Sequence, residues 1–158
     1  ILDVERILNE ISPVSTEVSA ELVEASVERN PHGRPVLVAD DSSVARKQVQ
    51  RALEAIGVQC VLAKDGREAL NMLLEMAKQG PILDQIALVI SDIEMPEMDG
   101  YTFTAEIRNN PNLKDLHVIL HTSLSGVFNQ AMVQKVGANN FIAKFQPDEL
   151  AKAVQGAL

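Results

Sequence analysis

The segment Ile86-Ala-Leu-Val-Ile-Ser-Asp92 decides how this chain is expected to fold. Apolar and β-branched residues run up to a single carboxylate, and the Pro/Gly-containing turn Ile93-Glu-Met-Pro-Glu-Met-Asp-Gly100 follows directly. An apolar run of this length is typical of a strand that is buried on both faces, as in a parallel sheet. Open α/β sheets bind their ligands at the carboxyl ends of such strands, so Asp92 is a candidate functional residue.

Three further apolar runs deliver a charged or hydroxyl residue where they stop. Val36-Leu-Val-Ala39 leads into Asp40 and Asp41, Val118-Ile-Leu-His121 into Thr122, and Phe141-Ile-Ala143 into Lys144. The carboxyl ends of parallel strands share one edge of a sheet, so these side chains are expected to converge there although they are far apart in sequence.

Strands and helices are expected to alternate from Val36 to the end of the chain. The expected strands cover 36–39, 59–63, 86–91, 118–121 and 141–143, and the expected helices cover 43–56, 67–78, 100–109, 126–136 and the segment from Pro147 onward. The first helix is expected to bury Val44, Val49, Ala52, Leu53 and Ile56. This alternation predicts an α/β fold, a doubly wound (βα)5 parallel sheet with helices on both faces and right-handed crossovers.

The first 33 residues are expected to form a helical extension and a linker, and residues 34–158 the main domain. Apolar residues at helical spacing predict a helix over 1–11, which Ser12-Pro13 ends, and a weaker helix over 14–25. The segment 30–35 has the composition of a linker.

The composition argues against several classes of function. The chain carries a net charge of −8 and no basic stripe, which argues against direct nucleic-acid binding. No apolar run approaches the roughly 20 residues that span a bilayer, so no membrane insertion is expected. Cys60 is expected to be a small core residue. Because it is the only cysteine, no intramolecular disulfide can form, which fits a cytoplasmic location. Because the chain begins at Ile1 rather than Met, it is expected to be a fragment.

The residues at the shared strand edge have the chemistry of a phosphoryl site. The carboxylates of Asp40, Asp41 and Asp92 repel one another unless a cation intervenes, and oxygen ligands completed by water favour Mg²⁺ over Ca²⁺. Asp92 is then the candidate nucleophile, while Lys144 and Thr122 can neutralise and hydrogen-bond phosphoryl oxygens. Each residue alone is more typical of a helix cap, a turn or a solvated strand end, but their coincidence favours function.

The order Asp40-Asp41, Asp92, Thr122, Lys144 resembles the receiver domain of two-component response regulators. The loop from Asp92 to Gly100 is similar to that family's phosphoacceptor loop, and the resemblance covers about residues 35–158. It implies a flavodoxin-like sheet with strand order 2-1-3-4-5. It also implies a phosphoacceptor signalling domain rather than an enzyme.

The resemblance assigns further roles by position. It implies that Asp41, Asp92 and the backbone carbonyl of Glu94 bind Mg²⁺, and that Asp40 contributes largely through water. It implies that Phe141 is an aromatic switch, which changes rotamer when the site threonine contacts the phosphoryl group. That change would alter the face formed by the fourth helix, the fifth strand and the fifth helix.

The sequence departs from the family pattern after the lysine and after the threonine. Receivers usually have proline after the lysine, in a cis bond, whereas Phe145 follows Lys144 here, so the geometry of this junction stays open. Ser123 replaces the alanine that is common after the threonine. Glu94 and Leu124 occupy positions that tune dephosphorylation in the family, and Leu124 is expected to hinder an in-line water.

Two longer stretches, His121–Asn129 and Ala143–Leu150, resemble CheV-type chemotaxis coupling proteins, which join an N-terminal CheW-like scaffold domain to a C-terminal receiver. Ile1–Leu8 is similar to the last helix of such a scaffold, and a generic amphipathic linker is an equal alternative. The resemblance implies phosphorylation by a chemotaxis histidine kinase and modulation of receptor–kinase coupling. Chemoreceptors would be contacted through a scaffold domain outside this chain.

Other functions stay open. A transcriptional response regulator would carry the same site, although its DNA-binding domain usually follows the receiver, whereas this chain ends at Leu158 with its last helix. An aspartyl-nucleophile phosphatase would find a general acid in Glu94, but the Asp40-Asp41 pair is not expected there. A receiver that takes up no phosphoryl group is disfavoured because the key residues are present. His121 is either structural or a modulator of the switch loop.

Overall fold

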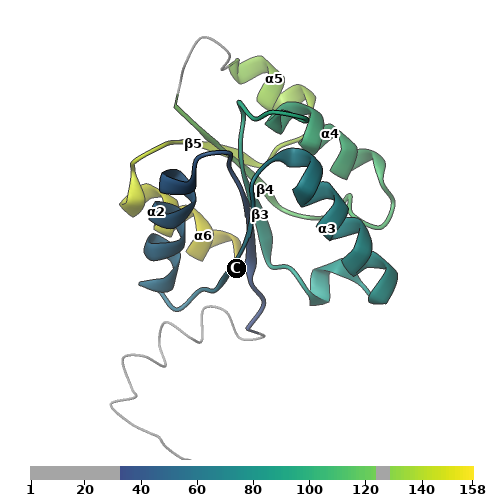
Figure 1. The fold of residues 1–158 in the computed structure, drawn as a ribbon, viewed down its shortest axis with the longest axis horizontal. Coiled ribbons are helices and arrows are strands. Elements are labelled where there is room, and N and C mark those ends of the chain that lie inside the picture. The colour runs from purple at the N-terminus through teal and green to yellow at the C-terminus, as the bar shows by residue number, and fades with distance from the viewer. Residues whose placement is uncertain (1–32, 124–128) are drawn as a thin grey trace, which may run out of the picture. The chain divides into compact units, whose positions relative to one another are not determined.

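The structure is a computed structural model that describes residues 33–123 and 129–158, within a unit that runs from His32 to Leu158. Five parallel strands form one sheet in the order β2-β1-β3-β4-β5 (Figure 1). The strands are β1 (Val36–Ala39), β2 (Cys60–Ala63), β3 (Leu88–Asp92), β4 (Val118–Thr122) and β5 (Asn140–Ala143). The expected flavodoxin-like sheet and its strand order are confirmed.

Helices cover both faces of the sheet, with α2 and α6 on one face and α3 and α4 on the other (Figure 1). The helices are α2 (Ser43–Glu54), α3 (Gly66–Gln79), α4 (Gly100–Asn109), α5 (Gln130–Lys135) and α6 (Pro147–Ala157), with a 3-10 turn, η1, at Ile82–Asp84. Over the described parts of the chain, no helix is both long enough and apolar enough to cross a membrane.

Alternate strand residues enter two separate cores, because successive side chains of a strand point to opposite faces. Under α2 and α6 the sheet contributes Val36, Val38, Leu88, Ile90, Ile119 and Ile142. Under α3 and α4 it contributes Leu37, Ala39, Val89 and Val118. All residues of β1, β3 and β4 are buried, which explains why these strands are continuous apolar runs rather than alternating ones.

The register of the strands aligns their carboxyl ends. Asp92 is paired with His121 across β3 and β4, and Thr122 is paired with Ala143 across β4 and β5. Asp40 follows β1, whose last residue Ala39 is level with Ser91. The polar residues that end the apolar runs therefore lie along one edge of the sheet.

Some expected elements differ in detail. Val44, expected in the core, is 62% exposed, because the buried stripe of α2 is Ala45, Val49 and Leu53, at intervals of four residues. Strand β3 starts two residues later than expected and includes Asp92 as its last residue. Of the helix expected over 126–136, the described part is α5, and the helices expected over 1–11 and 14–25 lie outside the described residues.

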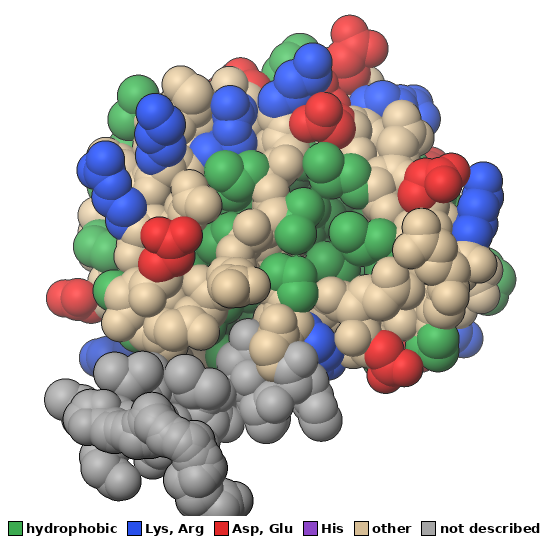
Figure 2. Space-filling model, turned by 60° about the horizontal axis from the view of Figure 1, so that its bottom comes forward, with side chains coloured by type: hydrophobic (Ala, Val, Ile, Leu, Met, Phe, Trp, Pro, Cys, Tyr) green, Lys and Arg blue, Asp and Glu red, His purple; other side chains and the backbone are tan. Residues whose placement is uncertain are grey.

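Figure 2 shows the domain turned so that the side at the bottom of Figure 1 comes forward. Hydrophobic side chains gather at the centre of this view, and both basic and acidic side chains lie around them, with several Lys and Arg side by side at the upper left. Charges of both signs therefore surround the apolar centre of this face.

Candidate functional site

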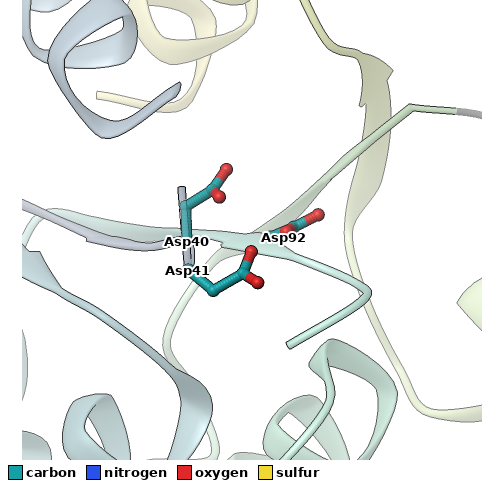
Figure 3. A group of neighbouring side chains, drawn as sticks. All are labelled: Asp40, Asp41 and Asp92. Carbon is teal, nitrogen blue, oxygen red and sulfur yellow. The ribbon is translucent and has the colours of Figure 1, made fainter. Parts of the chain in front are cut away.

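Three carboxylates meet where β1 and β3 end (Figure 3). Oxygen atoms of Asp40, Asp41 and Asp92 all lie within 4.8 Å of one another. Asp40 and Asp92 are 1% and 5% exposed, whereas Asp41 is exposed to solvent. The site therefore has two buried carboxylates and one carboxylate that faces solvent.

Lys144 joins these acids from the end of β5. Its Nζ lies 3.0 Å from Asp40 Oδ2 and 3.2 Å from Asp92 Oδ2. Its backbone N–H donates to the carbonyl of Thr122 at 2.7 Å, which fixes the end of β5 against the end of β4. The structure thus brings Asp40, Asp41, Asp92 and Lys144 together, as expected from the parallel topology.

The second oxygen of each buried carboxylate is held by the backbone. Asp40 Oδ1 accepts the N–H of Ser42 at 2.9 Å, and Asp92 Oδ1 accepts the N–H of Ile93 at 2.8 Å. Ser42 in turn caps α2, since its side chain accepts the N–H of Ala45. These bonds leave Oδ2 of both acids directed at Lys144.

The electrostatics of the site follow from two acids sharing one lysine. The pKa of Asp92 is raised to about 6, chiefly by burial and then by the charge of the neighbouring Asp40, while Lys144 partly opposes both effects. Burial alone would lower the pKa of Lys144, but hydrogen bonds and charge interactions with Asp40 and Asp92 outweigh it, so that pKa is raised. One cation is therefore insufficient to balance the two buried acids.

The donor set fits a hard divalent cation. All the available side-chain donors are carboxylate oxygens, which is the ligand type that Mg²⁺ prefers. Apart from its ion pair with Lys144, Asp40 Oδ2 has no hydrogen-bond partner among the described residues, although it is buried. A second positive charge at this point would satisfy that oxygen and relieve the repulsion between the acids.

The other predicted site residues lie on β4, on β5 and in the loop after Asp92. Thr122 is buried at the end of β4, and Glu94 is exposed two residues after Asp92. Phe141 is half-buried on β5 and packs against a small cluster formed by Ile93, Leu120 and Val133. Leu124 lies outside the described residues.

The loop after Asp92 depends on a close approach at Gly100. Its N–H donates to the carbonyl of Ile93 at 2.8 Å, and a β-carbon built on Gly100 would lie 2.2 Å from the carbonyl oxygen of Asp92. A side chain therefore cannot be accommodated at this position. Asp99 caps α4 by accepting the N–H of Thr102, so the Asp-Gly pair both starts α4 and places it against the site.

The junction after Lys144 has a conformation that sequence reasoning did not anticipate. Phe145 has a φ of +64°, in the left-handed region, and its side chain is 66% exposed. His121 lines a pocket together with Phe145, Val49 and Leu150. The pKa of His121 is lowered to about 4, chiefly by burial and then by the charge of Lys144, so its imidazole is neutral at pH 7.

Comparison with known proteins identifies the family. Residues 36–155 match the model of the response regulator receiver domain. The chain belongs to the response regulator receiver domain family. Receivers are phosphoacceptor signalling modules, and the acidic cluster of Asp40, Asp41 and Asp92 is typical of their metal site.

Several curated relatives resemble this receiver domain. Chemotaxis protein CheV1 of Helicobacter pylori is 28% identical over 156 residues, which cover 98% of this chain and 47% of CheV1. Protein PilG of Pseudomonas aeruginosa is 31% identical over 130 residues, 82% of this chain and 90% of PilG. The probable transcriptional regulator ycf27 of Guillardia theta is 34% identical over 124 residues, 78% of this chain and 44% of ycf27. The chain thus spans about half the length of CheV1 and of ycf27.

Solved receivers share the fold. CheY4 of Vibrio cholerae, a chemotaxis protein, aligns with a TM-score of 0.66 and 30% identity, over 79% of this chain and 98% of CheY4. The receiver domain of the sensor histidine kinase PA1611 from Pseudomonas aeruginosa aligns with a TM-score of 0.65 and 25% identity, over 78% of this chain and 96% of that domain. That structure contains a magnesium ion coordinated in its active-site cleft.

Proposed function

We propose that this receiver domain accepts a phosphoryl group on Asp92 from a chemotaxis-type histidine kinase and thereby modulates receptor–kinase coupling. The observation that carries the proposal is the position of Lys144, whose Nζ contacts Oδ2 of both Asp40 and Asp92 beside the solvent-facing Asp41. A buried nucleophile, a fixed cation and an open carboxylate cluster are the parts that phosphoryl transfer to an aspartate requires.

In the proposed reaction a carboxylate oxygen of Asp92 attacks the phosphorus of a phosphohistidine. The oxygen–phosphorus bond forms as the phosphorus–nitrogen bond breaks, and the imidazole leaves with the bonding electron pair. Lys144 compensates negative charge on the phosphoryl group, and the Thr122 hydroxyl donates a hydrogen bond to it. Mg²⁺ held by Asp41, Asp92 and the Glu94 carbonyl, with Asp40 acting through water, would supply further charge neutralisation.

The chemotaxis assignment is supported by the extent of the similarity to CheV1. That similarity covers 98% of this chain, including most of the residues before the receiver match. We therefore propose that residues 1–33 form a helical extension and linker after an upstream CheW-like domain, through which the whole protein meets chemoreceptors. A cytoplasmic location belongs to the same proposal.

A transcriptional response regulator is the second candidate. The similarity to ycf27 has a higher identity, 34%, but covers only 78% of this chain. The parent protein's sequence distinguishes the two candidates. A CheW-like domain upstream of Ile1 would support the chemotaxis role, and a DNA-binding domain after Leu158 would favour the regulator.

The phosphoacceptor role is tested by incubating the chain with acetyl phosphate and Mg²⁺ and measuring its intact mass. We expect one phosphoryl group on the native chain, none on Asp92→Asn, and one on Glu97→Gln, which removes an exposed acid from the same loop. A native chain that stays unmodified while its circular dichroism shows a folded protein would refute the proposal. Sustained hydrolysis of small phosphate esters would instead favour an aspartyl phosphatase.

A further inference from the structure

Helix α5 has little packing of its own to hold it in place. It spans six residues, and Val133 is its only buried one. A helix this short is unstable in isolation, so tertiary contacts must fix its position. Val133 packs against Ile93 and Leu120, and hydrogen bonds come from α4, which lies beside α5 (Figure 1).

Arg108 holds the carboxyl end of α5. Its Nε donates to the carbonyl of Gly137 at 2.8 Å, and its Nη2 donates to Asn139 Oδ1 at 2.7 Å. Its Nη1 donates to the carbonyls of Lys114 and Leu116 at 2.9 and 2.6 Å. Two of these four hydrogen bonds reach the segment after α5, and the other two fix the same planar guanidinium on the segment before β4, which makes this end a rigid attachment.

Gly137 completes this attachment. Its φ is +85°, and a β-carbon there would lie 3.1 Å from Cγ of Arg108. The left-handed conformation of Gly137 therefore ends α5, and the lack of a side chain lets its backbone pack against the aliphatic part of Arg108.

Tyr101 holds the amino end of α5 through a single hydroxyl. Its Oη accepts the N–H of Asn129 at 2.7 Å and donates to the carbonyl of Asn129 at 3.3 Å. Asn129 is the N-cap of α5, and its side chain accepts the N–H of Ala131 at 3.0 Å. Its carbonyl also accepts the N–H groups of Met132 and Val133, so the whole first turn depends on Asn129.

The two attachments differ: Arg108 bonds both to the segment after α5 and to the carbonyls of Lys114 and Leu116, whereas Tyr101 bonds to the N-cap residue Asn129. Tyr101 and Arg108 are seven residues apart, two turns of α4, so both project from the same side of that helix. We infer that Tyr101 is a positioning residue that latches the amino end of α5, while Arg108 and Gly137 form the pivot about which α5 turns when the latch opens. This inference deepens the proposed function, because it states which end of α5 the switch moves.

The latch is connected to the phosphoacceptor site by packing. The Tyr101 ring packs against the cluster of Ile93, Leu120 and Val133, on which Phe141 also packs. Ile93 directly follows Asp92, and Leu120 lies two residues before Thr122 on β4. A rearrangement around phosphorylated Asp92 that moves Ile93 or Leu120 changes the packing against the Tyr101 ring and so works against the hydrogen bond between its hydroxyl and Asn129.

Hydrogen exchange of the full chain, followed by NMR, tests the latch without any ligand. In Tyr101→Phe, which keeps the ring, we expect the amides of Ala131, Met132 and Val133 to exchange about three- to tenfold faster. The exchange rates of the sheet amides and of the Asn139 amide should be unchanged. In the control Thr102→Val, which alters an exposed neighbour, the exchange rates of all these amides should be unchanged. Unchanged exchange in the first turn of α5, or equal acceleration throughout the domain, would overturn the latch.

Titration with beryllofluoride and Mg²⁺, a mimic of the phosphoryl group, tests the coupling. The mimic favours the arrangement of α5 that phosphorylation produces, whereas the Tyr101 hydrogen bond favours the unphosphorylated arrangement. By linkage, this hydrogen bond therefore weakens the affinity for the mimic. We expect Tyr101→Phe to bind about three- to tenfold more tightly than the native chain, the same factor as in exchange. Equal affinity alongside faster exchange would overturn the coupling. A native chain that binds no beryllofluoride would instead refute the proposed function. The exchange experiment would still test the latch, because it uses no ligand.

Discussion

The ammonium of Lys144 lies 3.2 Å from Oδ2 of Asp92, and the same ammonium pairs with Asp40. Two buried acids thus depend on one cation, and the pKa of Asp92 is raised first by its burial and then by the charge of Asp40. This imbalance determines how the site responds to mutation, metal and pH.

Removing the lysine charge should make stability fall more steeply as pH rises. In Lys144→Met the pKa of Asp92 should rise above about 6, because the opposing cation is gone. An acid whose folded pKa exceeds its unfolded value binds protons more readily when folded, so the variant should lose stability as pH rises from about 4 through that raised pKa. Urea denaturation of both chains at pH 5 and pH 8 checks this. Equal destabilisation at both values would point to lost packing of the lysine stem.

Mg²⁺ should bind at the acidic cluster with an affinity that Asp41 controls. Asp41 is exposed, so Asp41→Asn should leave folding intact while weakening Mg²⁺ binding by about tenfold or more. Isothermal titration checks this, with Asp84→Asn as a control on the distant η1 turn. Protons compete for Asp92, so the native affinity should also fall as pH drops below about 6. Equal Mg²⁺ affinities of the native chain and Asp41→Asn would contradict the assignment.

His121 should limit stability in acid. Its pKa is about 4 in the folded domain and about 6.5 when unfolded, so only the unfolded chain takes up this proton between those values. Stability is therefore lost as pH falls from about 6.5 to 4, by roughly 2–3 kcal/mol at pH 4.5. Urea midpoints of the native chain and His121→Gln should converge or cross as pH is lowered from 7 to 4.5. A constant difference between them would mean that the imidazole titrates normally.

Phe145 should tolerate glycine and resist proline. Its φ of +64° is unfavourable for a residue with a β-carbon and inaccessible to proline, whose φ is near −65°. Phe145→Gly should therefore be more stable than Phe145→Ala by about 1 kcal/mol, since both lack the ring. Phe145→Pro should be the least stable of the three, or should shift Lys144 and lower phosphorylation. Thermal unfolding of the series checks this order, and a proline variant as stable as the glycine variant would contradict it.

Two glycines should respond oppositely to alanine. Gly100→Ala places a β-carbon 2.2 Å from the Asp92 carbonyl and should destabilise the domain strongly. Gly156→Ala, in α6, meets nothing within 4 Å and should stabilise it by about 0.5–1 kcal/mol. Chemical denaturation compares them. Similar effects at both positions would mean that the loop after Asp92 does not need the close approach.

Local patterns were sufficient to predict the sheet and the acidic cluster. The apolar run before Asp92 specifies a strand buried on both faces, and alternation with helices specifies a parallel sheet. Parallel topology then places the ends of β1, β3 and β5 at one edge, which is why Asp40, Asp41, Asp92 and Lys144 could be assigned to one site. Val44 was misplaced because a one-residue shift along a helix turns a side chain by about 100°.

The remaining features depend on contacts between segments that are distant in sequence. Nothing in the vicinity of Tyr101 indicates that its hydroxyl meets Asn129, because that bond exists only once α4 and α5 are packed side by side. The left-handed Phe145 and the neutral His121 likewise arise from how β4, β5 and α6 meet around one pocket. The sequence by itself determined that β1, β3 and β4 are buried and which polar residues end them, since burial and periodicity are properties of a short run. Only the tertiary structure decided hydrogen-bond partners, backbone strain and pKa values, because these depend on the distances and desolvation that packing creates.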